Sequence, residues 1–159
     1  MIIQKVQQFG KRILQTEGSI KKRARSICLG IFIAFSPFVG LHTLMAFALC
    51  WLFSLNYPIT VTVQLAINNP WTWVPVYGCG YGFGRLLSNV CHIDFAQCSP
   101  KFFSSIEPLC STVGVSADSI WIFFIGGNVL SVLLAISMYI PIKCLFKKLE
   151  QRKTSATSS

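Results

Sequence analysis

Three long apolar stretches dominate the hydrophobic pattern of this chain: residues 27–55, 59–87 and 120–142. No Asp, Glu, Lys or Arg occurs from Ser26 to Gly84, and none from Ser119 to Ile142. A helix needs roughly 20 apolar residues to cross a hydrocarbon core about 30 Å thick. The last stretch meets this requirement as a single span, and the two earlier ones exceed it.

Prolines interrupt both of the earlier stretches. A straight helix over residues 27–55 would be about 43 Å long, but Ser36-Pro37 and Gly40 lie in its middle. Asn68-Asn69-Pro70 divides residues 59–87 in the same way. Proline lacks a backbone donor and its ring clashes with the preceding helical turn. The pattern therefore predicts a kink or a turn at each of these two points.

The positive charges frame the apolar stretches. The net charge is +9, and apart from Arg85 and Lys101 every Lys and Arg lies before Ser26 or after Pro141. Under the positive-inside rule both ends belong in the cytoplasm, so the chain crosses the membrane an even number of times. Three apolar stretches satisfy this condition only if one of them reverses, as a hairpin or re-entrant segment. The sequence leaves open which one does.

The fold class expected is an all-α integral membrane protein with two proline-broken apolar segments, one of them re-entrant or a hairpin. A content of 53% hydrophobic and 12% charged residues agrees with a membrane location. Residues 88–118 contain three carboxylates and one lysine. This negative net charge suits the outer side of the membrane. The segments expected are a basic amphipathic N-terminal helix (1–25), a membrane core (26–87), a polar loop with an interfacial helix (88–118), a C-terminal transmembrane helix (119–146) and a disordered basic tail (147–159).

Polar side chains within the apolar stretches are the candidates for a functional site. Such groups are costly in hydrocarbon unless they face protein or water. Gln64 and Asn128 are two polar residues of this kind. A proline break also frees backbone carbonyls that nearby amides can satisfy. The hypothesis is a polar ligand pocket at the breaks, formed by Pro37, His42, Asn56, Asn68, Asn69, Thr72 and Arg85. The alternative is that these side chains only cap the broken helix ends.

Four glycines lie at positions 78, 80, 82 and 84, and they form two pairs with a spacing of four residues, Gly78 with Gly82 and Gly80 with Gly84. Small residues at this spacing let a second helix approach closely, so Gly80 and Gly84 are expected to form a helix-packing surface. A dinucleotide-binding loop is not indicated, because no strand precedes the glycines and no acidic residue follows at the required distance.

Catalytic, metal and cofactor chemistry finds little support in the sequence. Cys91-His92-x-Asp94 with Cys98 lacks the paired spacing of a zinc site, so no metal and no cofactor are expected. Cys91, Cys98 and Cys110 permit one disulfide in an oxidising compartment. The acidic residues Asp94, Glu107 and Asp118 are scattered over one loop without a nucleophile and base. We therefore expect a protein that is not an enzyme.

The motif of the membrane core resembles a known family. It reads Gly30-x-Phe32-x3-Ser36-Pro37-x2-Gly40-x-His42, then Asn56, then Asn69-Pro70-x-Thr72-x2-Pro75-x-Tyr77 and Gly84. This pattern is similar to the DUF2062 family of bacterial membrane proteins and covers roughly residues 21–87. The resemblance implies a multi-pass protein of the bacterial inner membrane without an established activity.

Two functions follow as expectations. The first is a membrane protein that binds or moves a small solute or a lipid head group through the polar pocket. The second is a non-catalytic scaffold or accessory protein for an envelope enzyme. The expected partners are membrane lipids, including anionic ones that attract the basic ends, and a second copy or another membrane protein. The placement of the cations argues against a nucleic-acid-binding face.

Overall fold

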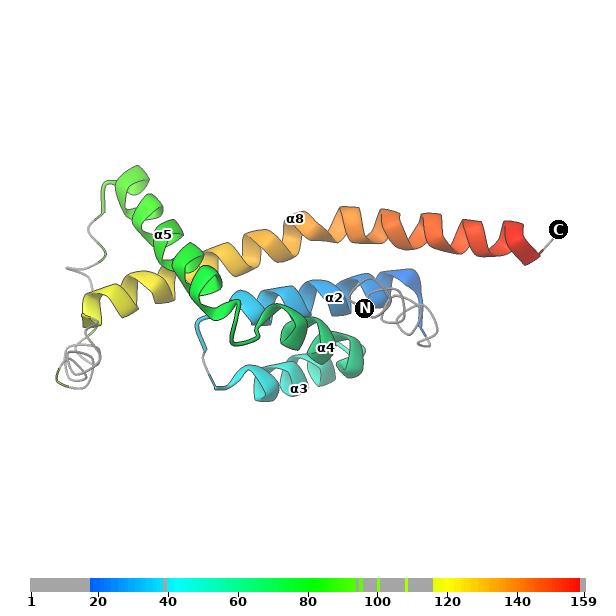
Figure 1. Ribbon diagram of the computed structural model, residues 1–159, viewed down its shortest axis with the longest axis horizontal. Coiled ribbons are helices and arrows are strands. Elements are labelled where there is room, and N and C mark those ends of the chain that lie inside the picture. Colours follow the sequence, from blue (N-terminus) through cyan, green and yellow to red (C-terminus); the bar gives the residue numbers. More distant parts are fainter. Residues whose placement is uncertain are drawn as a thin grey trace.

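The computed structural model describes residues 18–38, 40–93, 95, 100, 108 and 116–157, with side chains described as far as Gln151. Within these ranges the chain is helical and contains no strand (Figure 1). The helices are α2 (Ile20–Phe35), α3 (His42–Leu52), α4 (Tyr57–Ile67), α5 (Trp73–Cys91) and α8 (Ala117–Thr157). The all-α class predicted from the sequence is confirmed for the described residues.

The first helix ends at the first predicted break. Ser19 caps α2, its hydroxyl accepting a hydrogen bond from the Lys22 amide at 3.3 Å, and the helix stops at Phe35, directly before Ser36-Pro37. Helices end here because the residue before a proline is driven out of the helical region. Gly40 has a φ of +85°, a left-handed conformation that glycine adopts without steric penalty. The turn between α2 and α3 depends on it.

Helices α3 and α4 form a hairpin: α3 returns the chain to the start of α2, and α4 runs back toward the end of α2 (Figure 1). The amide of Asn56, between the two helices, donates to the Ser26 hydroxyl at 2.9 Å. The chain has therefore reversed its direction between Ser26 and Asn56. Gly30 lies where α2 and α4 touch, since a Cβ there would come within 2.7 Å of the Thr60 carbonyl oxygen.

After the second break α5 crosses α8 (Figure 1). A Cβ on Gly84 would lie 2.3 Å from the Ile122 carbonyl oxygen, and one on Gly126 would lie 2.3 Å from the Gly80 carbonyl oxygen. Small residues from both helices thus permit a backbone contact at the crossing. Gly80 and Gly84, predicted to pack against a helix, lie in this contact.

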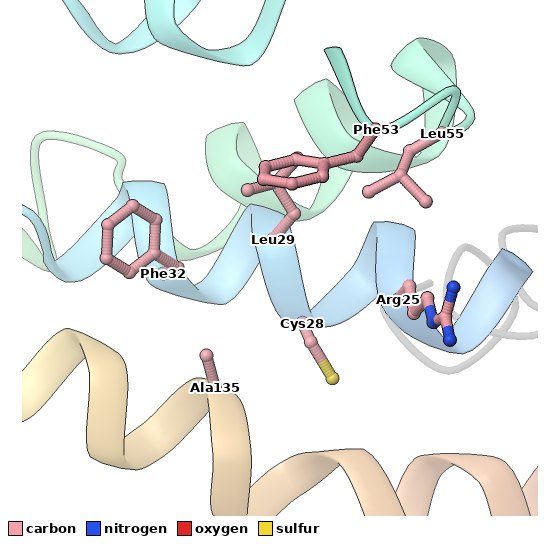
Figure 2. Close-up of a pocket in the computed structure, with 7 residues that line it drawn as sticks. All are labelled: Arg25, Cys28, Leu29, Phe32, Phe53, Leu55 and Ala135. Carbon is pink, nitrogen blue, oxygen red and sulfur yellow. The ribbon is translucent and has the colours of Figure 1, made fainter. Parts of the chain in front are cut away.

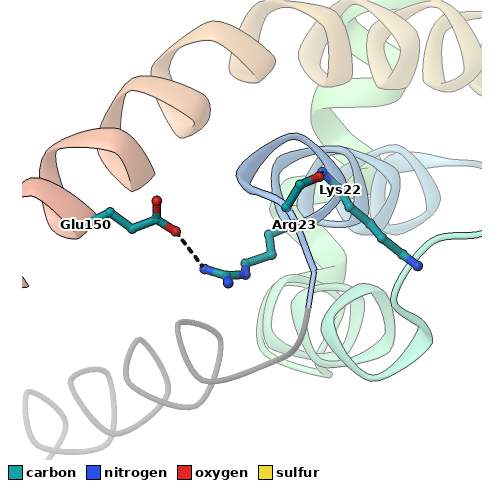
Figure 3. A network of polar contacts seen from close by, with 4 residues as sticks. Lys22, Arg23 and Glu150 are labelled. Carbon is teal, nitrogen blue, oxygen red and sulfur yellow. Dashed lines mark hydrogen bonds and ion pairs between the residues drawn. The ribbon is translucent and has the colours of Figure 1, made fainter.

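Helix α8 runs beside α2, so the basic start of α2 and the basic end of α8 lie close together. Arg23 pairs with Glu150 at 3.4 Å (Figure 3). Phe146 packs into the same buried cluster as Ala24, Ile59 and Val63. Charged and long side chains from Lys147 to Gln151 favour a helix, and α8 extends to Thr157. The expectation of a disordered tail from residue 147 onward therefore differs from the structure.

One described helix is long and apolar enough to span a membrane: α8, from Ala117 to Gln151. Helices α3 and α4 are apolar but shorter. Large apolar side chains are exposed on several faces, for example Trp51 at 79% and Ile140 at 68%, and exposure on this scale points to a surface that contacts lipid or protein. Of the amphipathic helix predicted for residues 1–25, residues 20–25 form the start of α2, and residues 1–17 lie outside the described residues. The interfacial helix predicted in residues 88–118 also lies outside the described residues.

Candidate functional site

The two helix breaks meet at His42, the first residue of α3. Its side chain is buried and its Nε2 lies 3.0 Å from the carbonyl oxygen of Ser36. On the other edge of the ring, Nδ1 lies 3.3 Å from Nδ2 of Asn68. His42 thus links the end of α2 to the end of α4, which are separated by the whole α3–α4 hairpin.

The partners of His42 define its hydrogen bonding. The Ser36 carbonyl only accepts, so the Nε2 atom carries a proton and donates. In the neutral ring Nδ1 then accepts, and the amide of Asn68 donates to it. The Ser36 carbonyl has no helical partner because α2 ends at Phe35, and His42 replaces the missing donor.

Several buried polar atoms around this pair have no hydrogen-bond partner among the described residues. Asn68 uses its amide nitrogen on His42, which leaves Oδ1 buried and unpaired. The Tyr77 hydroxyl of α5 lies close to the Asn68 side chain but outside hydrogen-bonding geometry, and it is also unpaired. The same holds for Ser36 Oγ and Gln64 Oε1. Unpaired buried groups cost stability and mark a place where a polar ligand or water fits.

Asn69 and Thr72 satisfy the backbone of the second break. Asn69 Oδ1 accepts from the amides of Trp71 at 3.0 Å and Thr72 at 3.3 Å, and its Nδ2 donates to the Ala66 carbonyl at 3.2 Å. Thr72 Oγ1 accepts from the Asn69 amide at 3.0 Å and is hydrogen bonded to the Ile67 carbonyl. These contacts match the capping alternative considered for the sequence.

The other predicted pocket residues have different positions. Pro37 is buried at the first break, near Gly127 of α8. Asn56 lies at the opposite end of α4 from Asn68, about 18 Å away along the helix. Arg85 is exposed on α5, about 12 Å beyond Tyr77 along its axis. The structure therefore brings together His42 and Asn68, with Asn69 and Thr72 beside them, but not Asn56 or Arg85.

A second buried polar cluster, at the other end of the hairpin, differs because its hydroxyls are satisfied. Thr60 Oγ1 donates to the Ser26 carbonyl at 3.0 Å, and the Cys50 thiol donates to Thr60 at 3.2 Å. The Ser26 hydroxyl donates to the Lys22 carbonyl and accepts from Asn56, both at 2.9 Å. Such a complete network serves to join helices. The cluster around His42 is incomplete.

A cavity of about 600 Å³ lies beside the incomplete cluster, between α5 and the first turns of α8. Its walls include Tyr77, Tyr81, Ser119 and Phe123. The rings of Tyr77 and Phe123 meet edge to face with their centroids 5.3 Å apart. Tyr77 therefore belongs both to the wall of this cavity and to the buried cluster.

Tyr77, Ser36 and Gln64 were absent from the pocket predicted from the sequence. Tyr77 was part of the family motif, but it was not assigned to the pocket. Gln64 was recognised as a polar residue within an apolar stretch, one helical turn before Asn68, and the i, i+4 spacing was the signal that places both on one face.

The cysteines described by the structure, Cys28, Cys50, Cys79, Cys91 and Cys144, are free. Cys98 and Cys110, the other members of the predicted disulfide set, lie outside the described residues. Within the described ranges, no three His, Cys, Asp or Glu side chains come close enough to hold a metal ion.

The described chain is thus an all-helical protein with one helix able to span a membrane and an incomplete polar cluster between two helix breaks. It belongs to the DUF2062 family, described as an uncharacterized protein conserved in bacteria, and the match covers residues 4–155. This match confirms the resemblance drawn from the Ser36-Pro37 and Asn69-Pro70 motifs. The comparisons with curated proteins and with solved structures gave no match.

Proposed function

We propose that this protein is a multi-pass protein of the bacterial inner membrane that binds a small solute or a lipid head group at the cluster around His42. The observation that carries the proposal is the set of buried polar atoms without partners: Ser36 Oγ, Gln64 Oε1, Asn68 Oδ1 and the Tyr77 hydroxyl. In a membrane interior such groups are expected to face a polar ligand or water. Binding, without a catalytic step, is the role proposed.

The path of the chain supports an arrangement with two crossings and one reversing segment. The hydrogen bond between Asn56 and Ser26 returns the chain to its starting level, so α2 and α3 together form the re-entrant segment. Helices α4 and α5 then make one bent crossing, and α8 makes the second. Arg23 and Glu150 hold the two basic ends side by side, consistent with both termini in the cytoplasm.

The cluster lies at the level of the membrane interior in this arrangement. A Cβ on Gly127 of α8 would lie 3.5 Å from Cδ of Pro37. The rings of Phe38 and Phe124 of α8 meet edge to face with their centroids 5.3 Å apart. Gly127 lies about 12 Å along α8 from Ser119 and about 22 Å from Ile142, the two ends of the uncharged stretch. Helix breaks at this depth are also where membrane transporters place substrate sites.

The chemistry of the cluster favours a ligand that donates hydrogen bonds. Asn68 Oδ1 and Gln64 Oε1 only accept, and the hydroxyls of Ser36 and Tyr77 accept as well as donate. The carboxylates described by the structure, Asp118 and Glu150, lie near the ends of the apolar part of α8 rather than in the cluster. We therefore propose hydroxyl or ammonium groups as the ligand chemistry, with the aromatic cavity beside Tyr77 as the route of entry.

The test is ligand-dependent thermal stability of the purified protein in detergent. Glycerol, ethanolamine and inorganic phosphate are titrated against the wild type, Asn68→Leu and the control Thr62→Val, which removes an exposed hydroxyl from the same helix. Glycerol or ethanolamine is expected to raise the unfolding temperature of the wild type and of Thr62→Val, but not of Asn68→Leu. An equal response of all three proteins would contradict the proposal.

The scaffold alternative makes a different prediction in the same experiment, because no probe would change the unfolding temperature of any variant. A partner protein would also need a surface other than Gly80 and Gly84, since both glycines are buried against α8. The incomplete polar cluster makes ligand binding the better supported of the two functions.

A further inference from the structure

An open groove runs along α2 at the basic end of the molecule, away from the cluster around His42. Two adjoining cavities of about 370 and 380 Å³ share Arg25, Cys28 and Ala135 as lining residues. Cys28 of α2 and Ala135 of α8 point into the space between the two helices (Figure 2). Arg25 is about 17 Å along α2 from Ser36, so this groove is separate from the proposed solute site.

The walls of the groove are apolar over most of their length. Leu29 and Phe32 of α2 line it together with Phe53 and Leu55 of the α3–α4 connection, and Leu29 lies beside the Phe53 ring (Figure 2). The wall formed by α8 continues through Ile136 and Tyr139. Arg25, Cys28, Leu29 and Phe32 lie on one face of α2 because their spacing is three to four residues. A long apolar chain fits such a surface, whereas a small hydrophilic anion has no favourable contact with it.

Positive charge is confined to one end of the groove. Arg25 is exposed and makes no ion pair with any described residue. Lys143 lies one helical turn after Tyr139, and its Nζ is 5.8 Å from the centre of the tyrosine ring. In contrast, Arg23 is neutralised by Glu150, and Lys22 points away from that pair (Figure 3). Arg25 and Lys143 thus leave a net positive charge at the mouth of an apolar groove.

Both cations also mark the boundary of the uncharged stretches. Arg25 directly precedes Ser26, where the first one begins, and Lys143 directly follows Ile142, where the last one ends. Two helices of opposite direction therefore place a cation at the same level. In the membrane arrangement proposed above, this is the level of the phosphate groups of the cytoplasmic leaflet.

We propose that this groove is a specific binding site for one anionic phospholipid. Arg25 binds the phosphate with its planar set of donors, Lys143 adds a second charge, and an acyl chain lies along Leu29, Phe32 and Ala135. Because the protein has other cations at this end, general attraction to an anionic membrane is expected as well. The specific site differs in that it requires both the Arg25 charge and the open groove.

The experiment is native mass spectrometry of the full-length protein in mild detergent, with added phosphatidylglycerol or phosphatidylcholine of the same acyl composition. The variants are Arg25→Gln, which removes the charge, and Ala135→Phe, which fills the groove. Lys148→Gln is the matched control, because it removes one exposed cation at the same end of α8 without lining the groove.

The wild type is expected to retain one phosphatidylglycerol in preference to phosphatidylcholine. Arg25→Gln should weaken phosphatidylglycerol binding about fivefold, as the loss of one cation near a lipid surface implies, and Lys148→Gln should leave it nearly unchanged. Ala135→Phe should lower the affinity with Arg25 intact.

Three results would overturn the proposal. Equal losses in Arg25→Gln and Lys148→Gln would mean general charge attraction. Unchanged binding in a folded Ala135→Phe would mean that the groove holds no acyl chain, and if this variant does not fold, the comparison of Arg25→Gln with Lys148→Gln still decides. Displacement of phosphatidylglycerol by millimolar inorganic phosphate would mean an anion site rather than a lipid site. None of these outcomes depends on the ligand of the His42 cluster, which is tested separately through Asn68.

Discussion

His42 stabilises the contact between the two helix breaks, because it is hydrogen bonded to a residue of each. Replacing it by Phe would leave the Ser36 carbonyl and the Asn68 amide without their partner. An unsatisfied buried carbonyl costs about 1–3 kcal/mol, and the half-buried Asn68 amide adds to this cost, so His42→Phe is expected to lower the free energy of unfolding by at least this amount. Thr43→Val, at the exposed neighbouring position, should change it by less than about 0.5 kcal/mol. Unfolding in mixed micelles measures both.

The same residues allow a stricter test of the link between the breaks. In a double-mutant cycle with His42→Phe and Asn68→Leu, residues in direct contact are expected to show a coupling energy of about 0.5–3 kcal/mol. Additive effects of the two substitutions would mean that His42 and Asn68 do not interact in the folded protein.

At the residue scale, the sequence predicted what depends on local chemistry. Asn69 and Thr72 lie beside Pro70 and bond to the backbone of their own turn, so their position in the sequence was informative. The contacts of His42 could not be predicted from the sequence. Its partner Asn68 is 26 residues away, and the hairpin brings the two together. Arg85 was assigned to the pocket from its polarity alone, and α5 carries it away from the breaks.

At the scale of elements, the crossing of α5 and α8 depends on glycines that face each other. Gly126→Ala would place a Cβ 2.3 Å from backbone atoms of Gly80 and Gly84, and the helices would have to separate. Overpacking of this kind is destabilising by about 1–3 kcal/mol. Gly78 on α5 provides the control, since a Cβ there meets no atom within 4 Å. Gly78→Ala should be neutral or stabilise the protein by up to about 1 kcal/mol, as measured by unfolding in micelles. Equal effects at the two positions would contradict this packing.

The ends of the elements followed from proline chemistry, but only in part. Helix α2 stops before Ser36-Pro37 and α4 before Asn68-Asn69-Pro70, as the sequence predicted. Pro75 lies in the first turn of α5 and is tolerated there because the first amides of a helix have no intrahelical partner. Pro141 lies inside α8 without ending it. A proline therefore marks a possible helix end, and the tertiary contacts decide whether the chain turns.

At the scale of the whole molecule, the sequence required one apolar stretch to reverse but left open which one. The charge rule constrains only the two basic ends, and both stretches contain a proline break of similar composition. What distinguishes them is the bond between Asn56 and Ser26, which joins residues 30 positions apart. Such a contact depends on how α2 and α4 pack around Gly30, a property that hydropathy and charge do not encode.

This reversal gives the last prediction, because in the proposed membrane arrangement it places the turn around Ser54 on the cytoplasmic side. A membrane-impermeant maleimide is added to cells with a permeabilised outer membrane, using variants that retain one cysteine each. Native Cys91 follows the crossing by α4 and α5 and should react from outside, whereas Ser54→Cys and native Cys144 should react only in inside-out vesicles. Labelling of Ser54→Cys from outside would mean that residues 27–55 cross the membrane and that the reversing segment lies in 59–87. The same result would move the cluster around His42 relative to the leaflets, since its depth follows from the path of α2 and α3.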